Sequence, residues 1–275
     1  MQPNLQRRVQ RYGWDLAADI YERAWGRQLA PAQETMLSGA RLKPDDDVLD
    51  VACGTGLVSF AAASTVGPMG GVLGVDISGQ MVEAARRRAS ERCISHIEFH
   101  RMDAETLEMP DAGFDVALCA LGLMYFPDPS RAMQEMRRTL RPGGRMSVAV
   151  WGRRSHCGWA EVFPIVDAEV RSEVCPLFFD LGAEGALAQV CAEAGFVDIE
   201  ERRISTTLVY ADEQEACDAA FIGGPAALAW SRFDPATRKR VCTSYIDSIE
   251  RWRYGTGFGV PGEFVVASGV VPRHQ

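Results

Sequence analysis

Asp50-Val51-Ala52-Cys53-Gly54-Thr55-Gly56 is the stretch that decides the fold. It ends an apolar run typical of a β-strand and precedes residues 57–66, an apolar run typical of a helix. Glycines at such a turn let the backbone bend tightly and approach a ligand, because no Cβ stands in the way. A Gly-x-Gly turn alone also fits an ordinary strand-to-helix connection, so its surroundings decide what it means.

The next apolar run, residues 72–75, ends in Asp76, which follows Gly54 by 22 residues. A carboxylate at the end of this second strand can accept hydrogen bonds from both hydroxyls of a ribose. Taken alone, Asp76 fits a surface aspartate at a strand end about equally well. Together with the glycine turn, it predicts a ligand that contains a nucleoside.

Two residues distinguish between nucleoside ligands. A dinucleotide site favours a third glycine near position 59, which holds the helix close to a pyrophosphate, but this position is Ser59. Asp50 places a negative charge ahead of the glycines, where it would repel phosphates and attract the ammonium group of an amino acid. The sequence therefore favours S-adenosylmethionine over NAD.

Short apolar runs alternate with helical patterns, which predicts right-handed βαβ units and a parallel sheet in a single α/β domain. We expect helices over residues 57–66, 80–92 and 182–194, and one that is capped by Ser130 and ends near residues 141–144. The expected strands are residues 48–51, 72–76, 97–101, 114–120, 146–151, 196–208 and 264–271.

Two further segments have no place in a minimal sheet of this kind. Residues 1–40 are expected to form a helical cover, and residues 212–253 a helical cap inserted before the last strand. The cap and the segment after the fifth strand are rich in aromatic residues, which would suit an apolar ligand pocket. Ordinary core packing would explain the same aromatic residues.

Composition argues against several kinds of partner. The 37 acidic and 29 basic residues leave a net charge of −8 without a basic patch, which argues against nucleic acid. The longest apolar run, about residues 116–126, is too short to cross a bilayer, and no signal-peptide pattern opens the chain. The eight cysteines lack the spacing of a zinc site, so we expect free thiols and no metal. Because the sequence shows neither a signal-peptide pattern nor a run long enough to cross a membrane, we expect a cytoplasmic protein.

Further short motifs accompany the glycine turn. They are Val75-Asp76-Ile77-Ser78 with Met81, Met102-Asp103-Ala104, Phe114-Asp115-Val116 and Leu140-Arg141-Pro142-Gly143-Gly144. With them, residues 40–152 resemble the class I S-adenosylmethionine-dependent methyltransferases, close to the group that includes the C-methyltransferases of ubiquinone and menaquinone biosynthesis. The resemblance implies a Rossmann-like, seven-stranded, mostly parallel sheet with helices on both faces and an antiparallel last strand.

The resemblance also implies a cofactor, S-adenosylmethionine, that lies across the carboxyl ends of the first strands and leaves as S-adenosylhomocysteine. Tyr21, in the N-terminal cover, would lie over it, although packing of a helix on the sheet would explain this aromatic residue as well. The methionine part would lie at Asp50, Gly54 and Gly56, the ribose at Asp76, the adenine at Ile77, Met81, Asp103 and Ala104, and the sulfonium near Cys119, Ala120 and Leu121. Ala52 would also bind the cofactor.

The acceptor is expected to be a small apolar or aromatic molecule. Tyr125, Trp151, His156 and Trp159 follow or end the fourth and fifth strands, at the edge where it should enter. His156 is the candidate for a general base if the acceptor needs one, although a surface histidine in a loop is the simpler interpretation.

Two other functions stay open: a nucleotide-dependent oxidoreductase and a non-catalytic protein that binds S-adenosylmethionine. Ser59 and Asp50 disfavour the first. The complete set of cofactor motifs disfavours the second, although binding motifs do not prove turnover. A nucleic-acid target is disfavoured because Ala120-Leu121-Gly122-Leu123 stands where amino-methylating enzymes of that kind carry an Asn/Asp-Pro-Pro-Tyr/Phe sequence.

Overall fold

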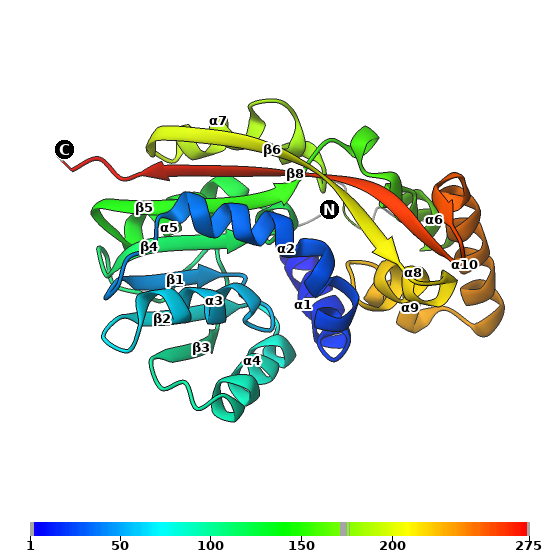
Figure 1. Cartoon of the computed structure of the whole chain (residues 1–275), viewed down its shortest axis with the longest axis horizontal. Helices are drawn as coiled ribbons and strands as arrows, with labels where there is room; N and C mark the ends of the chain where they lie inside the picture. The colour runs from blue at the N-terminus through cyan, green and yellow to red at the C-terminus, as the bar shows by residue number, and fades with distance from the viewer. Residues whose placement is uncertain (1–2, 171–174, 176, 274–275) are drawn as a thin grey trace.

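A sheet with the strand order β3-β2-β1-β4-β5-β8-β6 forms the middle of the computed structural model, which describes residues 3–170, 175 and 177–273. Strands β1 to β5 are parallel, and β8 is antiparallel to both β5 and β6 (Figure 1). The strands are β1 (Asp47–Val51), β2 (Gly71–Asp76), β3 (Ile97–Arg101), β4 (Phe114–Ala120), β5 (Leu140–Trp151), β6 (Val197–Tyr210), β7 (Arg253–Tyr254) and β8 (Gly257–Val270).

This topology confirms the predicted Rossmann-like, mostly parallel sheet. The prediction of seven strands is one short of the eight in the described residues, because the two-residue β7 also pairs with β8. β1 and β4 lie in the middle of the sheet, and Val48, Leu49 and Leu118 are fully buried there. Strands covered on both faces are continuous apolar runs, which is why the sequence located them well.

Helices cover both faces of the sheet. α2 (Tyr21–Ala40) and α3 (Leu57–Val66) pack together on one face, and α5 (Pro129–Thr139) and α7 (Ala186–Glu193) pack together on the other (Figure 1). α4 (Gly79–Glu91) packs on β2 and β3. Short 3₁₀ turns connect these elements: η1 (Leu123–Tyr125), η2 (Arg154–His156), η3 (Gly158–Glu161), η4 (Asp180–Gly182) and η6 (Glu250–Trp252).

The predicted cap of α5 is wrong by two residues. Asp128, not Ser130, is the N-cap, since its side chain accepts a hydrogen bond from the backbone N–H of Arg131 at 2.9 Å. Pro129 occupies the first helical position, where its fixed φ suits the helix and its missing N–H costs nothing. Ser130 therefore lies inside the first turn.

β6 and β8 continue well beyond the end of β5. Trp151, the last residue of β5, pairs with Phe264, whereas β6 and β8 remain paired as far as Tyr210 and Phe258. Residues 257–263 were not predicted as strand because glycines and Pro261 interrupt their apolar pattern. The result is a two-stranded ribbon that projects past the carboxyl edge of the parallel strands.

Residues 212–253, the segment predicted as a cap, connect β6 to β8 at the far end of this ribbon. The cap contains α8 (Glu213–Cys217), a π-helical turn η5 (Asp218–Ile222), α9 (Ala227–Arg232) and α10 (Pro235–Ile249), and α6 (Val162–Val170) packs on α10 (Figure 1). Its aromatic side chains contact one another: the ring of Phe221 stacks on Trp230 at 5.2 Å and meets Tyr245 edge-on at 5.6 Å. They thus form the core of the cap.

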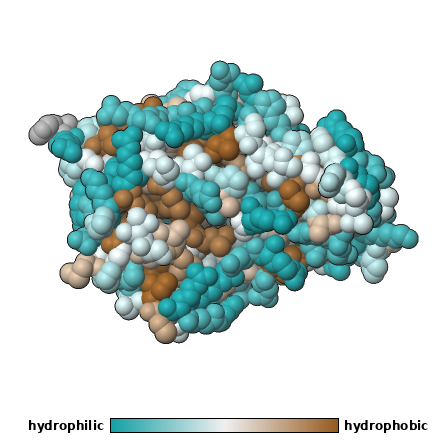
Figure 2. Space-filling view, in the orientation of Figure 1, coloured by the Kyte–Doolittle hydropathy of each residue, from teal (hydrophilic) through white to brown (hydrophobic). Residues whose placement is uncertain are grey.

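α1 (Pro3–Ala17) lies between the sheet edge and the cap, where it contacts α9 and α4. Figure 2 shows that apolar residues gather mainly in the middle of the visible face, while hydrophilic residues surround them. Within the described part of the chain, no helix is both long and apolar enough to cross a membrane.

Candidate functional site

The glycine turn after β1 has a backbone that few side chains tolerate. Ala52, Gly54 and Gly56 all have positive φ angles, of 57°, 56° and 89°. A Cβ on Gly56 would lie 2.8 Å from a ring carbon of Phe60 and 3.0 Å from one of Phe99, so glycine is required there. The turn brings bare backbone to the carboxyl end of β1, directly before α3.

Asp76 connects this turn to β2. Its Oδ2 accepts a hydrogen bond from the Gly54 N–H at 2.9 Å, and its Oδ1 accepts one from the Ser78 N–H at 2.8 Å. These bonds fix the carboxylate, and each of its oxygens keeps a lone pair for a ligand hydroxyl. The two motifs that the sequence separates by 22 residues therefore form one unit.

Asp50 lies fully buried beneath the turn. The Ser59 hydroxyl donates a hydrogen bond to its Oδ2 at 2.5 Å, but Asp50 Oδ1 has no hydrogen-bond partner within the described residues. An unpartnered buried oxygen of a carboxylate is costly unless a positive charge lies nearby. This arrangement suits a cationic cofactor and opposes a pyrophosphate, as Ser59 and Asp50 predicted.

Burial also changes how these acids titrate. It raises the pKa of Asp50 to about 7, and the charge of Asp76 adds to this effect while the Ser59 hydrogen bond opposes it. It raises the pKa of Asp76 to about 6, against the hydrogen bonds from Ser78 and Gly54. Both carboxyls therefore ionise at a higher pH than an exposed aspartate does, and a positively charged ligand would favour their ionised forms.

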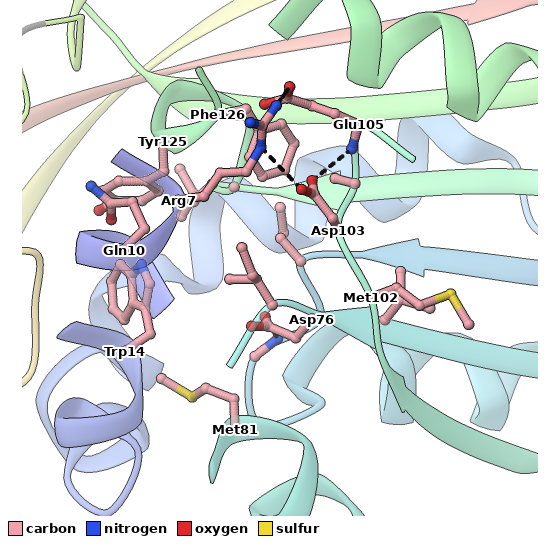
Figure 3. A pocket seen from close by; sticks show the side chains of 18 of the residues that line it. Arg7, Gln10, Trp14, Asp76, Met81, Met102, Asp103, Glu105, Tyr125 and Phe126 are labelled. Atoms are coloured by element: carbon pink, nitrogen blue, oxygen red, sulfur yellow. Dashed lines mark hydrogen bonds and ion pairs between the residues drawn. The ribbon is translucent and has the colours of Figure 1, made fainter. Parts of the chain in front are cut away.

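A cavity opens beside Asp76, between the sheet edge and α1 (Figure 3). Ten of the predicted cofactor residues line it: Tyr21, Ala52, Gly54, Asp76, Ile77, Met81, Asp103, Ala104, Ala120 and Leu121.

Asp50, Gly56 and Cys119 were also predicted to contact the cofactor, but they do not line the cavity. Gly56 faces Phe60 and Phe99, and Cys119 is fully buried within β4. Asp50 can act on a ligand through its charge rather than by direct exposure to the cavity.

The sequence missed the contribution of α1. Arg7, Gln10 and Trp14 line the cavity, and Figure 3 shows them on the helix that faces Asp76 and Asp103. Their spacing of three and four residues places them on one face of a helix. This spacing is visible in the sequence and indicates a shared helix face, but no motif marks that face as a binding surface. Glu105 and Phe126, which also line the cavity, follow β3 and β4 without any signature.

Aromatic rings close the cavity on the side of α1 and α2. Trp14 meets Tyr21 and Tyr125 edge-on, with ring centroids 5.8 Å and 5.1 Å apart. Burial, and then the charges of Asp76 and Asp50, raise the pKa of Tyr21 far above its usual range. The Tyr21 phenol therefore keeps its proton and can serve as a hydrogen-bond donor, not as a base.

A second, smaller cavity adjoins the first and shares Trp14, Tyr21, Leu121 and Tyr125 with it. Three of the four predicted acceptor residues, Tyr125, Trp151 and Trp159, line this cavity. Trp159 is 2% exposed, and its Nε1 has no hydrogen-bond partner in the described structure. Among the described residues that line this cavity, only Gly224 and Pro225 belong to the cap.

His156 lies apart from both cavities. Its Nδ1 is 2.8 Å from Glu263 Oε1, and half of its side chain is exposed. Glu263 also accepts hydrogen bonds from the backbone of Arg153 and the guanidinium of Arg203, at 2.9 and 3.1 Å. This network ties β8 to the segment after β5, so a structural role explains His156 better than a general base does.

Comparisons with known proteins show which family the chain resembles. A family described as a methyltransferase domain matches residues 42–174. Nocamycin O-methyltransferase of Saccharothrix syringae is 32% identical over 206 residues, which cover 68% of this chain and 72% of that protein. Demethylmenaquinone methyltransferase of Listeria monocytogenes serotype 4a is 34% identical over 123 residues, which cover 45% of this chain and 52% of that protein. The chain thus spans about half the length of the latter relative.

Among solved structures, the fold is similar to that of phosphoethanolamine N-methyltransferase 2 of Haemonchus contortus, determined in complex with S-adenosyl-L-methionine. The TM-score is 0.61 at 16% identity, over 94% of this chain and 57% of that one. On the strength of the domain match and the relative covered over most of its length, the chain belongs to the S-adenosylmethionine-dependent methyltransferases.

Proposed function

We propose that the protein transfers the methyl group of S-adenosylmethionine to a small apolar or aromatic acceptor that enters the second cavity. The observation that carries this proposal is the pairing of two cavities, one beside Asp76 and one lined by tryptophans, that share Tyr21 and Tyr125. The relatives named for nocamycin and demethylmenaquinone are named for small molecules, which favours an acceptor of this class.

When bound, the cofactor supplies a methyl group on a positively charged sulfur. A nucleophilic atom of the acceptor would bond to the methyl carbon as the carbon–sulfur bond breaks, and the electron pair of that broken bond would return to sulfur. A neutral nucleophile also releases a proton. The chain's own contribution is to align the reactants and exclude water, which can supply much of the rate.

Individual residues suit these tasks. Asp76 is fixed for the ribose hydroxyls, and Asp103 and Ala104 lie where the adenine edge is expected. Tyr21 covers the turn, because a Cβ on Gly54 would lie 3.8 Å from its ring. In the second cavity, Trp159 Nε1 is available to donate a hydrogen bond to an oxygen or nitrogen of the acceptor.

The cap, residues 212–253, is proposed to complete this acceptor cavity through Gly224 and Pro225 and to support α1 through α9. A single domain with an N-terminal cover and a cap is compatible with these contacts. The absence of a nucleic-acid partner and a cytoplasmic location stay predictions from the composition. An oxidoreductase would need a pyrophosphate beside the buried Asp50, which opposes it.

Release of S-adenosylhomocysteine, measured with purified protein, S-adenosylmethionine and a panel of acceptors, tests this proposal. The panel contains hydroxylated aromatics and quinols, small polar amines such as ethanolamine, and transfer RNA. We expect methylation to be confined to the aromatic group. Turnover only with the polar amines or the RNA would overturn the proposed acceptor class, and micromolar binding of NADH would revive the oxidoreductase.

A further inference from the structure

The adenine end of the cofactor cavity holds a group of charges that no sequence motif predicts. Arg7 Nε, from α1, lies 3.0 Å from Asp103 Oδ2, and another nitrogen of the same guanidinium contacts the Glu105 carboxylate. Figure 3 shows this side chain extending from α1 to both acids. One arginine thus bridges the helix to the two carboxylates that follow β3.

Each of the two acids also accepts a hydrogen bond from a backbone N–H group. Asp103 Oδ1 accepts a hydrogen bond from the Glu105 N–H at 3.0 Å, and Glu105 Oε1 accepts one from the Asp128 N–H at 3.2 Å. Glu105 is 4% exposed, so its charge is poorly screened by water. Without Arg7, two neighbouring carboxylates would face the cavity unopposed by this cation.

Arg7 holds only one end of α1. At the other end, Asp15 Oδ1 accepts hydrogen bonds from the Ser78 hydroxyl at 2.7 Å and the Gln80 N–H at 3.1 Å. α1 is therefore attached on both sides of the cavity, with Gln10 and Trp14 lining it in between.

We infer that Arg7 is a positioning residue that latches α1 over the bound cofactor and sets how fast the cofactor exchanges. Because Gln10 and Trp14 line the cavity from α1, exchange requires this helix to move, and the Arg7 contacts are broken when its first turns lift away. The same contacts hold Asp103 where the adenine amine is expected. This inference rests on the cofactor site and is independent of the acceptor.

The test measures dissociation of S-adenosylhomocysteine by stopped-flow displacement, with tryptophan fluorescence as the signal because Trp14 lines the site. In Arg7→Ala, we expect dissociation to be roughly three- to tenfold faster, as for loss of a partly buried charge pair. The KM for S-adenosylmethionine should rise by a similar factor while kcat changes little. Added salt should accelerate release from the wild type more than from Arg7→Ala.

Arg8→Ala is the matched control, since it removes the same charge from an exposed position of the same helix. It should release S-adenosylhomocysteine at the wild-type rate. If Arg7→Ala does not fold, Arg7→Lys serves instead, because lysine keeps the charge but cannot bridge two carboxylates as a planar guanidinium does. The latch would be overturned if the Arg7 variant released S-adenosylhomocysteine at the wild-type rate. It would also be overturned if Arg8→Ala accelerated this release as much as the Arg7 variant does. Failure of the wild type to bind S-adenosylhomocysteine would instead contradict the cofactor site itself.

Discussion

At the scale of single residues, the site depends on carboxylates whose oxygens are already partly engaged. Asp76 uses one lone pair of each oxygen on the backbone N–H groups of Gly54 and Ser78. The remaining lone pairs of the Asp76 oxygens can accept hydrogen bonds from a ligand without any movement of the side chain. Asp76 therefore supports the fold of the turn, and we propose that it also binds the ribose.

Asp76→Ala should weaken the binding of S-adenosylmethionine by about 1.5 to 3 kcal/mol, because hydrogen bonds to a charged acceptor are lost. Calorimetric titration measures this change directly. Asp19→Ala is the control, since Asp19 is an exposed carboxylate in the turn between α1 and α2 and lies outside the cavity lining. Equal affinity of the two variants for the cofactor would remove Asp76 from the binding site.

Trp159 offers a complementary test on the acceptor side. Trp159→Phe keeps the ring in the aromatic cluster but removes Nε1, which has no partner within the described structure. We expect the KM for the acceptor to rise about five- to tenfold, for one lost hydrogen bond, with unchanged affinity for S-adenosylmethionine. Trp230→Phe, in the core of the cap, should leave both quantities unchanged. An unchanged acceptor KM in Trp159→Phe would show that Nε1 does not contact the acceptor.

At the scale of helices and strands, the sequence located the elements whose apolar pattern matches their burial, including the edge strand β3, in which apolar residues alternate with exposed polar ones. Residues 57–66, 97–101 and 114–120 were predicted with the bounds that the structure has, because their apolar pattern follows directly from their burial. The short helices α6 and α9 were missed, since each owes its stability to packing rather than to local signals. The Arg7 contacts join residues almost a hundred positions apart, so no local pattern could indicate them.

The cap also acts differently from what its aromatic content suggested. Phe221, Trp230 and Tyr245 pack on one another, whereas small residues of the cap approach the site. Ala227, on α9, is buried in a cluster with Ala17, Ala18 and Met81. The cap therefore supports the helix that closes the cofactor cavity.

Ala227→Asp should loosen α1, because it buries an unpaired carboxylate between α9 and the N-terminal helices. We expect faster release of S-adenosylhomocysteine at a temperature where the variant is still folded. Ser231→Asp places the same charge on the exposed side of α9 and should behave like the wild type. Identical release rates for the two variants would mean that α9 does not hold α1 in place.

At the scale of the whole molecule, the two buried acids of the cofactor site connect the stability of the fold to pH. The pKa values of Asp50 and Asp76 in the fold, about 7 and about 6, lie above the ordinary value of 3.8. Ionising these carboxyls therefore costs more in the folded protein than in the unfolded chain. Their contribution to stability is fully present below about pH 4 and is lost as the pH rises through 6 and 7.

The last prediction combines this titration with the charge of the ligand. Asp50→Asn, which cannot ionise, should stabilise the cofactor-free protein by about 1 to 3 kcal/mol at pH 8 and much less at pH 5. In the wild type, S-adenosylmethionine should raise the Tm more at pH 8 than at pH 5, because its positive charges favour the ionised acids. S-adenosylhomocysteine lacks the sulfonium charge, so its stabilisation should depend less on pH. Thermal unfolding at both pH values measures all of these, and a pH-independent effect of Asp50→Asn would show that Asp50 is already ionised at pH 5 in the folded protein.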